Sequence, residues 1–205
     1  MSIYYKYAPY GPKHFFLSYV DDCIYWYASK GIGKWFVDTL WKIFHVNLLG
    51  YAHWFMSIRI SQLKDHSISV DQAIYATSIV EKYLHTDTVK VSNKFYKTAF
   101  PSDIIFTKED VSTSDEQVDK LTKEYYIHYR ACIGSLIYLL STRVDLSFAV
   151  HKLEKVSANL GKVQFEGLIH LLRYIRNNKT LVLKYYTDLN DAPVTDLLRQ
   201  ANIKT

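Results

Sequence analysis

Two adjacent aspartates, Asp21 and Asp22, stand between two runs of β-prone aromatic and apolar residues, and this arrangement constrains the fold most strongly. The runs, residues 14–20 (HFFLSYV) and 23–28 (CIYWYA), predict two antiparallel strands joined by a tight turn. Neighbouring carboxylates in a regular strand point to opposite faces, whereas at a turn both can approach one cation. The sequence therefore predicts a hairpin with Asp21 and Asp22 at its tip, an arrangement that suits Mg²⁺ and is also common in ordinary turns.

Composition excludes several classes of protein. Of the 205 residues, 49% are hydrophobic, which is enough apolar surface to exclude collagen-like, low-complexity and wholly disordered chains. No apolar run is long enough to cross a bilayer, so we expect no membrane partner. Cys23 and Cys132 form neither a disulfide framework nor a metal motif, which favours a reducing compartment. The whole net charge of +5 lies in residues 125–205, which favours an anionic partner there, with a solvated helix face as the alternative.

Periodicity divides the rest of the chain into a mixed first part, a polar segment and a helical last part. Ser29 opens an amphipathic helix whose aromatic residues predict a buried stripe: Trp35, Phe36, Trp41 and Phe44. Strands are predicted at 53–60 and 68–70, followed by a helix over 74–83 that Asp71 caps. Residues 86–124 read as a polar surface linker. Helices at 126–141, 145–160 and 163–178, a strand at 181–186 and a weak helix from about 194 complete the predicted elements.

Several motifs, taken in order, resemble the reverse transcriptases of Ty1/copia-type retrotransposons. Residues 19–22 form the Tyr-x-Asp-Asp box, within the string FFLSYVDDCIYWY. Residues 50–60 (GYAHWFMSIRI) are similar to the family's primer-grip hairpin, and residues 72–75 to the Gln-x-x-Tyr helix after it. Residues 129–146 (YRACIGSLIYLLSTRVDL) look like the Tyr-Arg-x-x-Val-Gly-Ser-Leu signature with its Thr-Arg-Pro-Asp continuation, and residues 171–175 match the next helix. The matches cover about residues 14–186.

The resemblance implies RNA-directed DNA polymerisation, in which two Mg²⁺ ions activate the primer hydroxyl and hold the phosphates of the incoming nucleotide. Asp21 and Asp22 would be the catalytic and metal-binding residues of this chain. Phe55, Met56 and Ser57 would position the primer end. The implied partners are an RNA/DNA template-primer duplex, a dNTP and the rest of the Pol polyprotein, in a cytoplasmic particle or the nucleus.

The chain also departs from the family pattern. The third catalytic carboxylate of the family lies on an earlier strand, but no Asp or Glu precedes Tyr19, and the finger region is missing. Met56-Ser57 replaces the usual Leu-Gly, so a Cβ stands where the family has glycine. The family's RNase H domain follows this region, but its carboxylate cluster is not visible, and the aspartates near the C-terminus read as turn and cap residues: Asp188, Asp191 and Asp196. We expect a chain without RNase H activity and without polymerase activity of its own.

Basic residues at three-residue spacing on the last helices are candidates for contacts with a nucleic-acid backbone. A solvated helix face is the alternative for all of them. Together with Tyr19, which supports the turn, the predicted nucleic-acid-binding set contains Lys152, Lys155, Arg173, Arg176 and Lys179.

We therefore predict an α+β fragment. Residues 1–85 form a partial reverse-transcriptase palm with two β-hairpins, residues 86–124 a polar linker, and residues 125–205 a helical thumb-like or connection module with a C-terminal strand and tail. The alternative is a non-catalytic nucleic-acid-binding or structural remnant, and a salt titration of duplex binding separates the two hypotheses.

Overall fold

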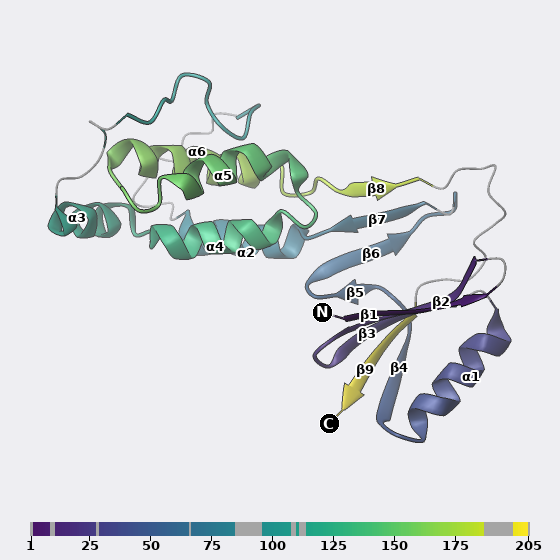
Figure 1. Cartoon of the computed structure of the whole chain (residues 1–205). Coiled ribbons are helices and arrows are strands. Elements are labelled where there is room, and N and C mark those ends of the chain that lie inside the picture. The colour runs from purple at the N-terminus through teal and green to yellow at the C-terminus, as the bar shows by residue number, and fades with distance from the viewer. Residues whose placement is uncertain are drawn as a thin grey trace. The chain divides into compact units, whose positions relative to one another are not determined.

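The computed structural model describes residues 2–8, 11–27, 29–65, 67–84, 96–107, 110, 114–186 and 199–204. The chain divides into two compact units (Figure 1). The sheet unit comprises residues 1–70 and 183–205, and the helical unit comprises residues 71–182. Strands and helices thus concentrate in different parts of an α+β chain. The units do not follow the predicted boundaries at 85 and 125, because the helix after residue 72 packs with the later helices and residues 183–185 join a sheet of the first unit.

The sheet unit contains a five-stranded sheet in the order β1-β2-β3-β9-β4, in which every paired strand is antiparallel to its neighbour. The strands are β1 (Ser2–Ala8), β2 (Gly11–Tyr19), β3 (Asp22–Tyr27), β4 (His45–Tyr51) and β9 (Arg199–Lys204). Helix α1 (Lys30–Trp41) connects β3 to β4, and the Ser29 hydroxyl caps it by accepting a hydrogen bond from the Ile32 backbone N–H. The predicted hairpin and the first helix are confirmed.

The predicted weak helix from about residue 194 is wrong for residues 199–204, which form strand β9. Strand β9 lies between β3 and β4 and pairs with both. Two strand edges offer this short polar segment hydrogen-bond partners on both sides, and this tertiary pairing overrides a weak local preference.

The second sheet has the order β5-β6-β7-β8 and also belongs to the sheet unit. Its strands are β5 (Trp54–Phe55), β6 (Ile58–Gln62), β7 (Ile68–Asp71) and β8 (Leu183–Tyr185). The single strand predicted for residues 53–60 is therefore two strands joined at Met56 and Ser57, whose φ angles are 50° and 60°. Positive φ at both turn residues is the geometry of a tight two-residue hairpin. The strand predicted for residues 181–186 is confirmed as β8, which pairs with β7.

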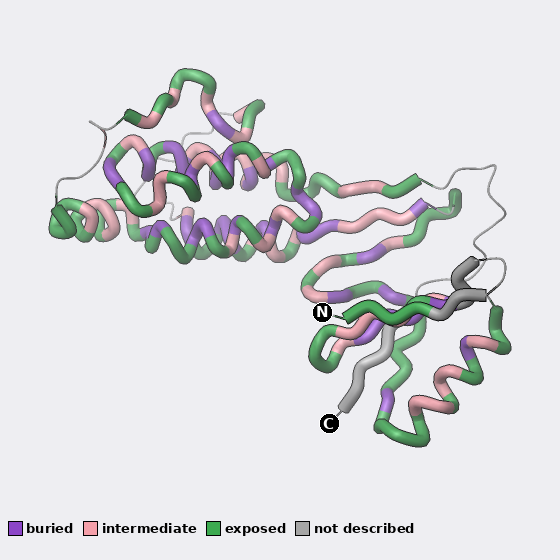
Figure 2. The backbone as a smooth tube through the Cα atoms, in the orientation of Figure 1, coloured by how far each residue is buried: buried purple, intermediate pink, exposed green. Residues whose placement is uncertain are grey.

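The helical unit is built around one apolar core. Its elements are α2 (Ala73–Tyr83), α3 (Asp115–Tyr125), α4 (Tyr129–Leu139), the short 3₁₀ helix η2 (Val144–Leu146), α5 (Ser147–Lys155) and α6 (Lys162–Asn177), and they confirm the three predicted C-terminal helices. Buried residues recur along α2, α4, α5 and α6 and form one cluster (Figure 2). Phe165, Leu168 and Leu172 of α6 are fully buried in it. In the described part of the chain, no helix combines the length and apolar character that a bilayer crossing requires.

Helix α3 overlaps the segment predicted as a polar surface linker, so that prediction is wrong for residues 115–124. The Ser114 hydroxyl accepts a hydrogen bond from the Gln117 backbone N–H, and Asp115 and Glu116 in the first turn favour the positive end of the helix dipole. The few apolar residues of α3, Val118, Leu121 and Tyr125, pack against the core. Tyr125 stacks on the Phe165 ring at 5.3 Å between centroids.

The predicted buried stripe of α1 is mostly exposed. The exposed fractions are 53% for Trp35, 57% for Trp41 and 49% for Phe44, whereas Phe36 is half-buried and stacks on Tyr25 at 4.1 Å. Only one side of α1 meets the sheet. The aromatic stripe is wider than this contact. Phe36 therefore packs on the sheet, whereas Trp35 and Trp41 face solvent.

Candidate functional site

The first candidate site is the tip of the β2–β3 hairpin. Tyr19 and Asp22 form the last strand pair, so the two turn residues are Val20 and Asp21 rather than the predicted Asp21 and Asp22. The extra ladder pair at Asp22 shifts the tip by one residue. Asp21 is exposed and Asp22 is half-buried at the start of β3, so both carboxylates stand at the same end of the hairpin.

Val20 holds an unusual backbone conformation at this tip. Its φ is 49° and its side chain is 80% exposed. A β-branched residue at positive φ costs roughly 1–3 kcal/mol, and strain of this kind clusters at functional sites. The strained turn places Asp21 at the outermost position of the hairpin.

Directly behind the carboxylates the hairpin is closed and apolar. Cys23 is fully buried. Burial raises the pKa of its thiol, a hydrogen bond with Ser18 lowers it, and the charge of Asp22 raises it, so that the pKa is raised overall. Cys23 is therefore a neutral packing residue, as burial of a thiol in apolar surroundings predicts.

The predicted primer-grip residues lie at the tip of a second hairpin, β5–β6, that packs against the first. Phe55 is 7% exposed, Met56 is half-buried and Ser57 is exposed. Phe55 belongs to the same apolar cluster as Ile24 of β3, and Leu17 of β2 and Met56 pack against that cluster. The structure thus brings the two predicted hairpins together within one unit.

The donor set at the hairpin tip fits one Mg²⁺ ion rather than two. Mg²⁺ accepts one or two protein carboxylates and completes its shell with water and phosphate oxygens, which Asp21 and Asp22 permit. Within the ranges that the structure describes, no group of three or more His, Cys, Asp or Glu side chains is placed to hold a metal. The described residues therefore offer two carboxylates at this tip and no third metal ligand beside them. Asp188, Asp191 and Asp196 lie outside them.

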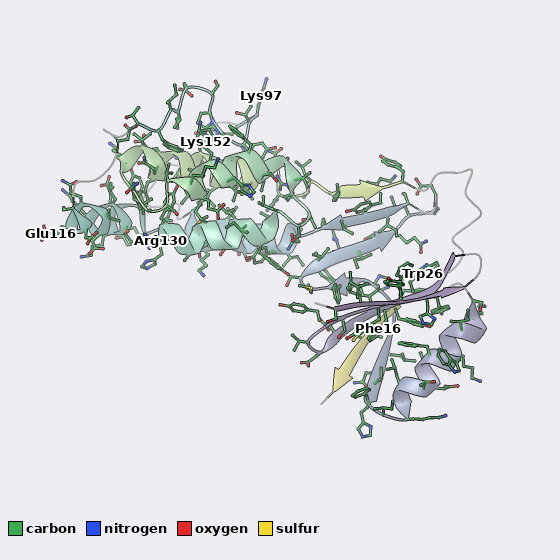
Figure 3. The ribbon with its side chains drawn as sticks, in the orientation of Figure 1. Phe16, Trp26, Lys97, Glu116, Arg130 and Lys152 are labelled. Atoms are coloured by element: carbon green, nitrogen blue, oxygen red, sulfur yellow. The ribbon has the colours of Figure 1, made fainter. Side chains whose placement is uncertain are left out.

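Lys152, a predicted nucleic-acid contact, is used inside the helical unit (Figure 3). Its Nζ atom donates a hydrogen bond to the Ile104 carbonyl at 3.0 Å. It also lies 4.3, 5.6 and 5.7 Å from the ring centroids of Phe100, Phe106 and Phe148. Three ring faces around one ammonium stabilise it by cation–π attraction. A nucleic-acid phosphate could bind the Lys152 ammonium only if it displaced these contacts.

The other predicted basic residues differ in exposure. Arg173 is half-buried and donates through Nη1 to the Tyr96 hydroxyl at 3.1 Å. Arg176 is half-buried in the last turn of α6, while Lys155 and Lys179 are exposed. Lys155 and Lys179 are therefore the more accessible candidates for backbone contacts. Tyr19, with an exposed fraction of 41%, ends β2 beside the hairpin tip.

The sequence reading overlooked a charged network at Arg143. This side chain is 2% exposed and donates through Nε and Nη2 to the two Asp145 carboxylate oxygens at 2.8 Å each. Its Nη1 donates to the Asn178 carbonyl at 2.9 Å, and the Tyr174 hydroxyl donates to Asp145 at 3.0 Å. The Thr-Arg-Val-Asp motif therefore ties η2 to the end of α6. The Arg–x–Asp spacing of residues 143 and 145 is the sequence feature that could have predicted this ion pair.

The sequence motifs resemble those of retrotransposon Pol polyproteins. The chain is 26% identical over 187 residues to the "Retrovirus-related Pol polyprotein from transposon TNT 1-94" of Nicotiana tabacum. The match covers 86% of this chain and 14% of that polyprotein, so the chain spans a small part of its relative's length. No family model matches the chain. No solved structure matches it either. The similarity supports a Ty1/copia-type retrotransposon polyprotein as the source of the chain.

Proposed function

We propose that this chain is the part of a Ty1/copia-type reverse transcriptase, an RNA-directed DNA polymerase, that carries the metal-binding hairpin and contacts the template-primer duplex. One observation carries the proposal. The strained, exposed Val20–Asp21 turn presents two adjacent carboxylates, and its strands pack through Leu17 and Ile24 on the hairpin of Phe55 and Met56.

In this proposal, Asp21 and Asp22 hold a Mg²⁺ ion, which supplies activation of the primer 3′-hydroxyl and charge neutralisation at the nucleotide phosphates. Residues Phe55–Ser57 position the primer end from the β5–β6 hairpin, whose Phe55 shares one apolar cluster with Ile24 of β3. Two carboxylates serve one ion, so we expect no nucleotide transfer by this chain alone. The dNTP and the second ion require groups from the rest of the polyprotein.

The duplex-binding role rests on the exposed cations of the last helices. Lys155 lies in the last turn of α5 and Lys179 follows the end of α6, and both are exposed. Cations at helix C-termini are also favoured by the helix dipole, so their placement alone does not require a ligand. Binding that weakens steeply with salt would identify them as phosphate contacts.

A structural remnant is the second candidate function, and two observations favour it. Lys152 and Arg173 are committed to contacts within the helical unit. The described residues also bring no third metal ligand to the hairpin. A remnant would keep the fold and lose affinity for both metal and duplex.

Binding of Mn²⁺, a paramagnetic substitute for Mg²⁺, tests the metal site by electron paramagnetic resonance. We expect one bound ion in the native chain and loss of at least tenfold in affinity in Asp21→Asn/Asp22→Asn, because the ion loses both carboxylate ligands that the described residues offer at the hairpin tip. Asp38→Asn is the matched control, since Asp38 is an exposed aspartate of α1 in the same unit. Equal binding by all three chains would refute the metal site.

A salt titration of RNA–DNA duplex binding tests the second half of the proposal. We expect log K to fall linearly with log[salt], and the slope to lose about one in magnitude for each phosphate contact removed by Lys155→Glu or Lys179→Glu. Lys120→Glu, an exposed position of α3, is the control. Affinity without salt dependence, or none at all, would leave only the structural remnant.

A further inference from the structure

Strand β1 stands at one edge of the five-stranded sheet. One of its edges pairs with β2, and in the described part of the chain no other strand pairs with its outer edge. An edge strand presents a row of backbone N–H and C=O groups that can pair with another chain. The register of β1 with β2 is regular from Ser2 to Lys6 and shifts between Lys6 and Tyr7. We call residues 2–6 the edge segment.

The edge segment exposes large apolar side chains on both faces of the sheet (Figure 2). Successive residues of a strand point to opposite faces, so Ile3 and Tyr5 share one face and Tyr4 points to the other. Their exposed fractions are 60% for Ile3, 60% for Tyr4 and 57% for Tyr5. The ring centroids of Tyr5 and Phe15 are 6.4 Å apart, and those of Tyr4 and Phe16 are 6.2 Å apart. A row of rings therefore reaches the edge of the sheet on each face.

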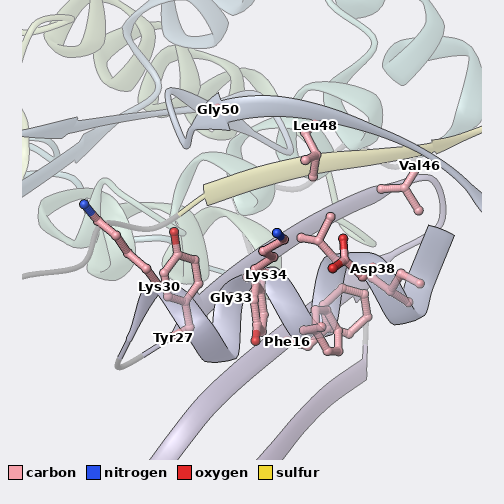
Figure 4. Close-up of a pocket in the computed structure, with 13 residues that line it drawn as sticks. Phe16, Tyr27, Lys30, Gly33, Lys34, Asp38, Val46, Leu48 and Gly50 are labelled. Atoms are coloured by element: carbon pink, nitrogen blue, oxygen red, sulfur yellow. The ribbon is translucent and has the colours of Figure 1, made fainter.

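Helix α1 covers only the inner part of its face of the sheet. The Phe16 ring lies 5.2 Å from the Phe36 ring of α1, and Phe16 and Tyr25 line the pocket under this helix (Figure 4). Tyr4 pairs with Phe16, but its exposure shows that α1 does not cover it. The helix therefore leaves the edge of the sheet exposed on this face as well.

Few features of the edge segment protect it from pairing with another strand. Natural edges are blocked by charged residues, proline, bulges or very short strands. Lys6 is the one charged residue of the segment, and the first prolines of the sequence, Pro9 and Pro12, come after it. Residues 2–5 thus form an uncharged stretch of serine, isoleucine and tyrosine, and isoleucine and tyrosine favour strands.

The edge segment is complementary to a second copy of itself. Tyr4 is its middle residue, so a twofold axis at Tyr4 pairs all five residues with those of an antiparallel copy. Tyr4 then lies opposite Tyr4 of the second copy, and Ile3 lies opposite Tyr5 in both halves. Lys6 lies opposite Ser2, so no like charges meet. Directly opposed aromatic and β-branched side chains stabilise antiparallel pairing.

We propose that the chain forms a symmetric dimer in which the edge segments of two copies pair antiparallel about a twofold axis at Tyr4. The five-stranded sheets of the two copies then form one continuous sheet. The exposed rows of Ile3, Tyr4 and Tyr5 match themselves under this symmetry, which favours a second copy over a strand of unrelated sequence.

The dimer contact is separate from the metal-binding hairpin. Ser2 pairs with Ser18, so the tip of the β2–β3 hairpin lies at the Ser2 end of β1. Antiparallel pairing puts the Ser2 ends of the two copies at opposite ends of the contact. Asp21 and Asp22 therefore take no part in the dimer, which goes beyond the proposed function and does not depend on it.

The size of the contact predicts a weak dimer. A fully buried aromatic side chain covers about 150–250 Å², so at the observed exposures Ile3, Tyr4 and Tyr5 each have roughly 100–150 Å² left to bury. Burial of these side chains in both copies removes roughly 600–900 Å² from water, whereas stable interfaces bury about 1,200–2,000 Å². We therefore expect a dimer that dissociates at micromolar concentration and forms as the concentration approaches millimolar.

Sedimentation equilibrium of the full chain, from micromolar to millimolar concentration, measures the dimer. We expect Tyr4→Lys to weaken dimerisation at least tenfold, because two ammonium groups then oppose each other at the twofold axis. Trp41→Lys is the matched control. It changes a similarly exposed aromatic residue on α1 of the same unit and should leave the dimer unchanged. Circular dichroism verifies that both variants fold.

Cysteine cross-linking tests the register without the charge variants. Paired residues have Cα atoms about 4.5–5.5 Å apart, which is within the span of a disulfide. Added diamide, which accepts the two thiol hydrogens, should join two Tyr4→Cys chains through one disulfide. Ile3→Cys, which faces Tyr5 of the second copy, should give little of this product. The native chain is the background control, because Cys23 and Cys132 are buried.

A chain that stays monomeric at millimolar concentration would overturn the proposal, and so would assemblies larger than a dimer. A dimer that Tyr4→Lys leaves unchanged, or that Trp41→Lys weakens equally, would also contradict it. Equal cross-linking of Ile3→Cys and Tyr4→Cys would refute the twofold axis at Tyr4. The assays contain neither metal nor nucleic acid, so their failure leaves the proposed function standing, and failure of metal or duplex binding leaves the dimer standing.

Discussion

Replacing Arg143 by Met should destabilise the helical unit by about 3 kcal/mol. Met retains much of the apolar volume and removes the three hydrogen bonds that Arg143 donates to Asp145 and Asn178. Breaking one partner of a buried ion pair costs about 3–5 kcal/mol. The Arg143 side chain is 2% exposed, but that of Asp145 is 33% exposed, so water partly resolvates the carboxylate and places the cost at the lower end.

Urea unfolding followed by far-ultraviolet circular dichroism, with hydrogen exchange of α6 amides, measures this loss for the helical unit separately. Arg143→Lys is the control, because lysine keeps the charge but cannot make the bidentate contact with Asp145. We expect it to lose about half as much unfolding free energy as Arg143→Met. A double-mutant cycle with Asp145→Asn should give a coupling energy of about 1–2 kcal/mol. A loss below about 0.5 kcal/mol for Arg143→Met, which is typical of a surface substitution, would refute the network's structural role.

Other substitutions test separate parts of the structure. Gly161→Ala should destabilise by about 3 kcal/mol in thermal unfolding, because its Cβ would lie 1.7 Å from the Asp110 carbonyl oxygen, whereas Gly134→Ala in open space on α4 should stabilise by about 1 kcal/mol. Equal effects would contradict the packing. Ser57→Gly should stabilise the β5–β6 hairpin by about 0.5–1 kcal/mol, because relief of the positive φ outweighs the extra chain entropy that glycine loses on folding; destabilisation measured by urea titration would contradict this. Burial raises the pKa of Asp145, but hydrogen bonds and the charge of Arg143 lower it more strongly. The stabilisation it gives is complete above the unfolded pKa of about 3.9 and is lost as the pH falls through the lower folded value, so the stability difference between the native chain and Arg143→Met should shrink as the pH falls below about 3.9.

The sequence predicted the elements that local patterns specify. Alternating aromatic residues around Asp21 and Asp22 predicted the hairpin, and apolar spacing predicted α1, α2 and the three C-terminal helices. Helix α3 was missed because three apolar residues in a polar window give a weak signal, although Ser114 and its following acidic residues were a readable cap.

What the sequence did not predict depends on residues that meet only in the fold. Strand β9 exists through pairing with β3 and β4, which lie more than a hundred residues earlier. From the sequence, Lys152 is predicted to be an exposed cation, because its contacts with Phe100 and Phe106 form only in the folded chain. The candidate hairpin site was predicted residue by residue, but its turn is Val20–Asp21, because strand register is set by the whole ladder.

The central claim is that Asp21 and Asp22 hold a metal ion at the primer end of a bound duplex. Fe²⁺ in place of Mg²⁺ reduces added hydrogen peroxide to hydroxide and a hydroxyl radical, and added ascorbate returns the Fe³⁺ to Fe²⁺. The radicals cleave nucleic acid close to the ion, so cleavage of an end-labelled RNA–DNA primer-template maps the metal directly. We expect cuts confined to a few nucleotides around the primer 3′ end, present with Asp38→Asn and absent with Asp21→Asn/Asp22→Asn. Cleavage spread along the duplex, or an unchanged pattern in the double variant, would contradict it.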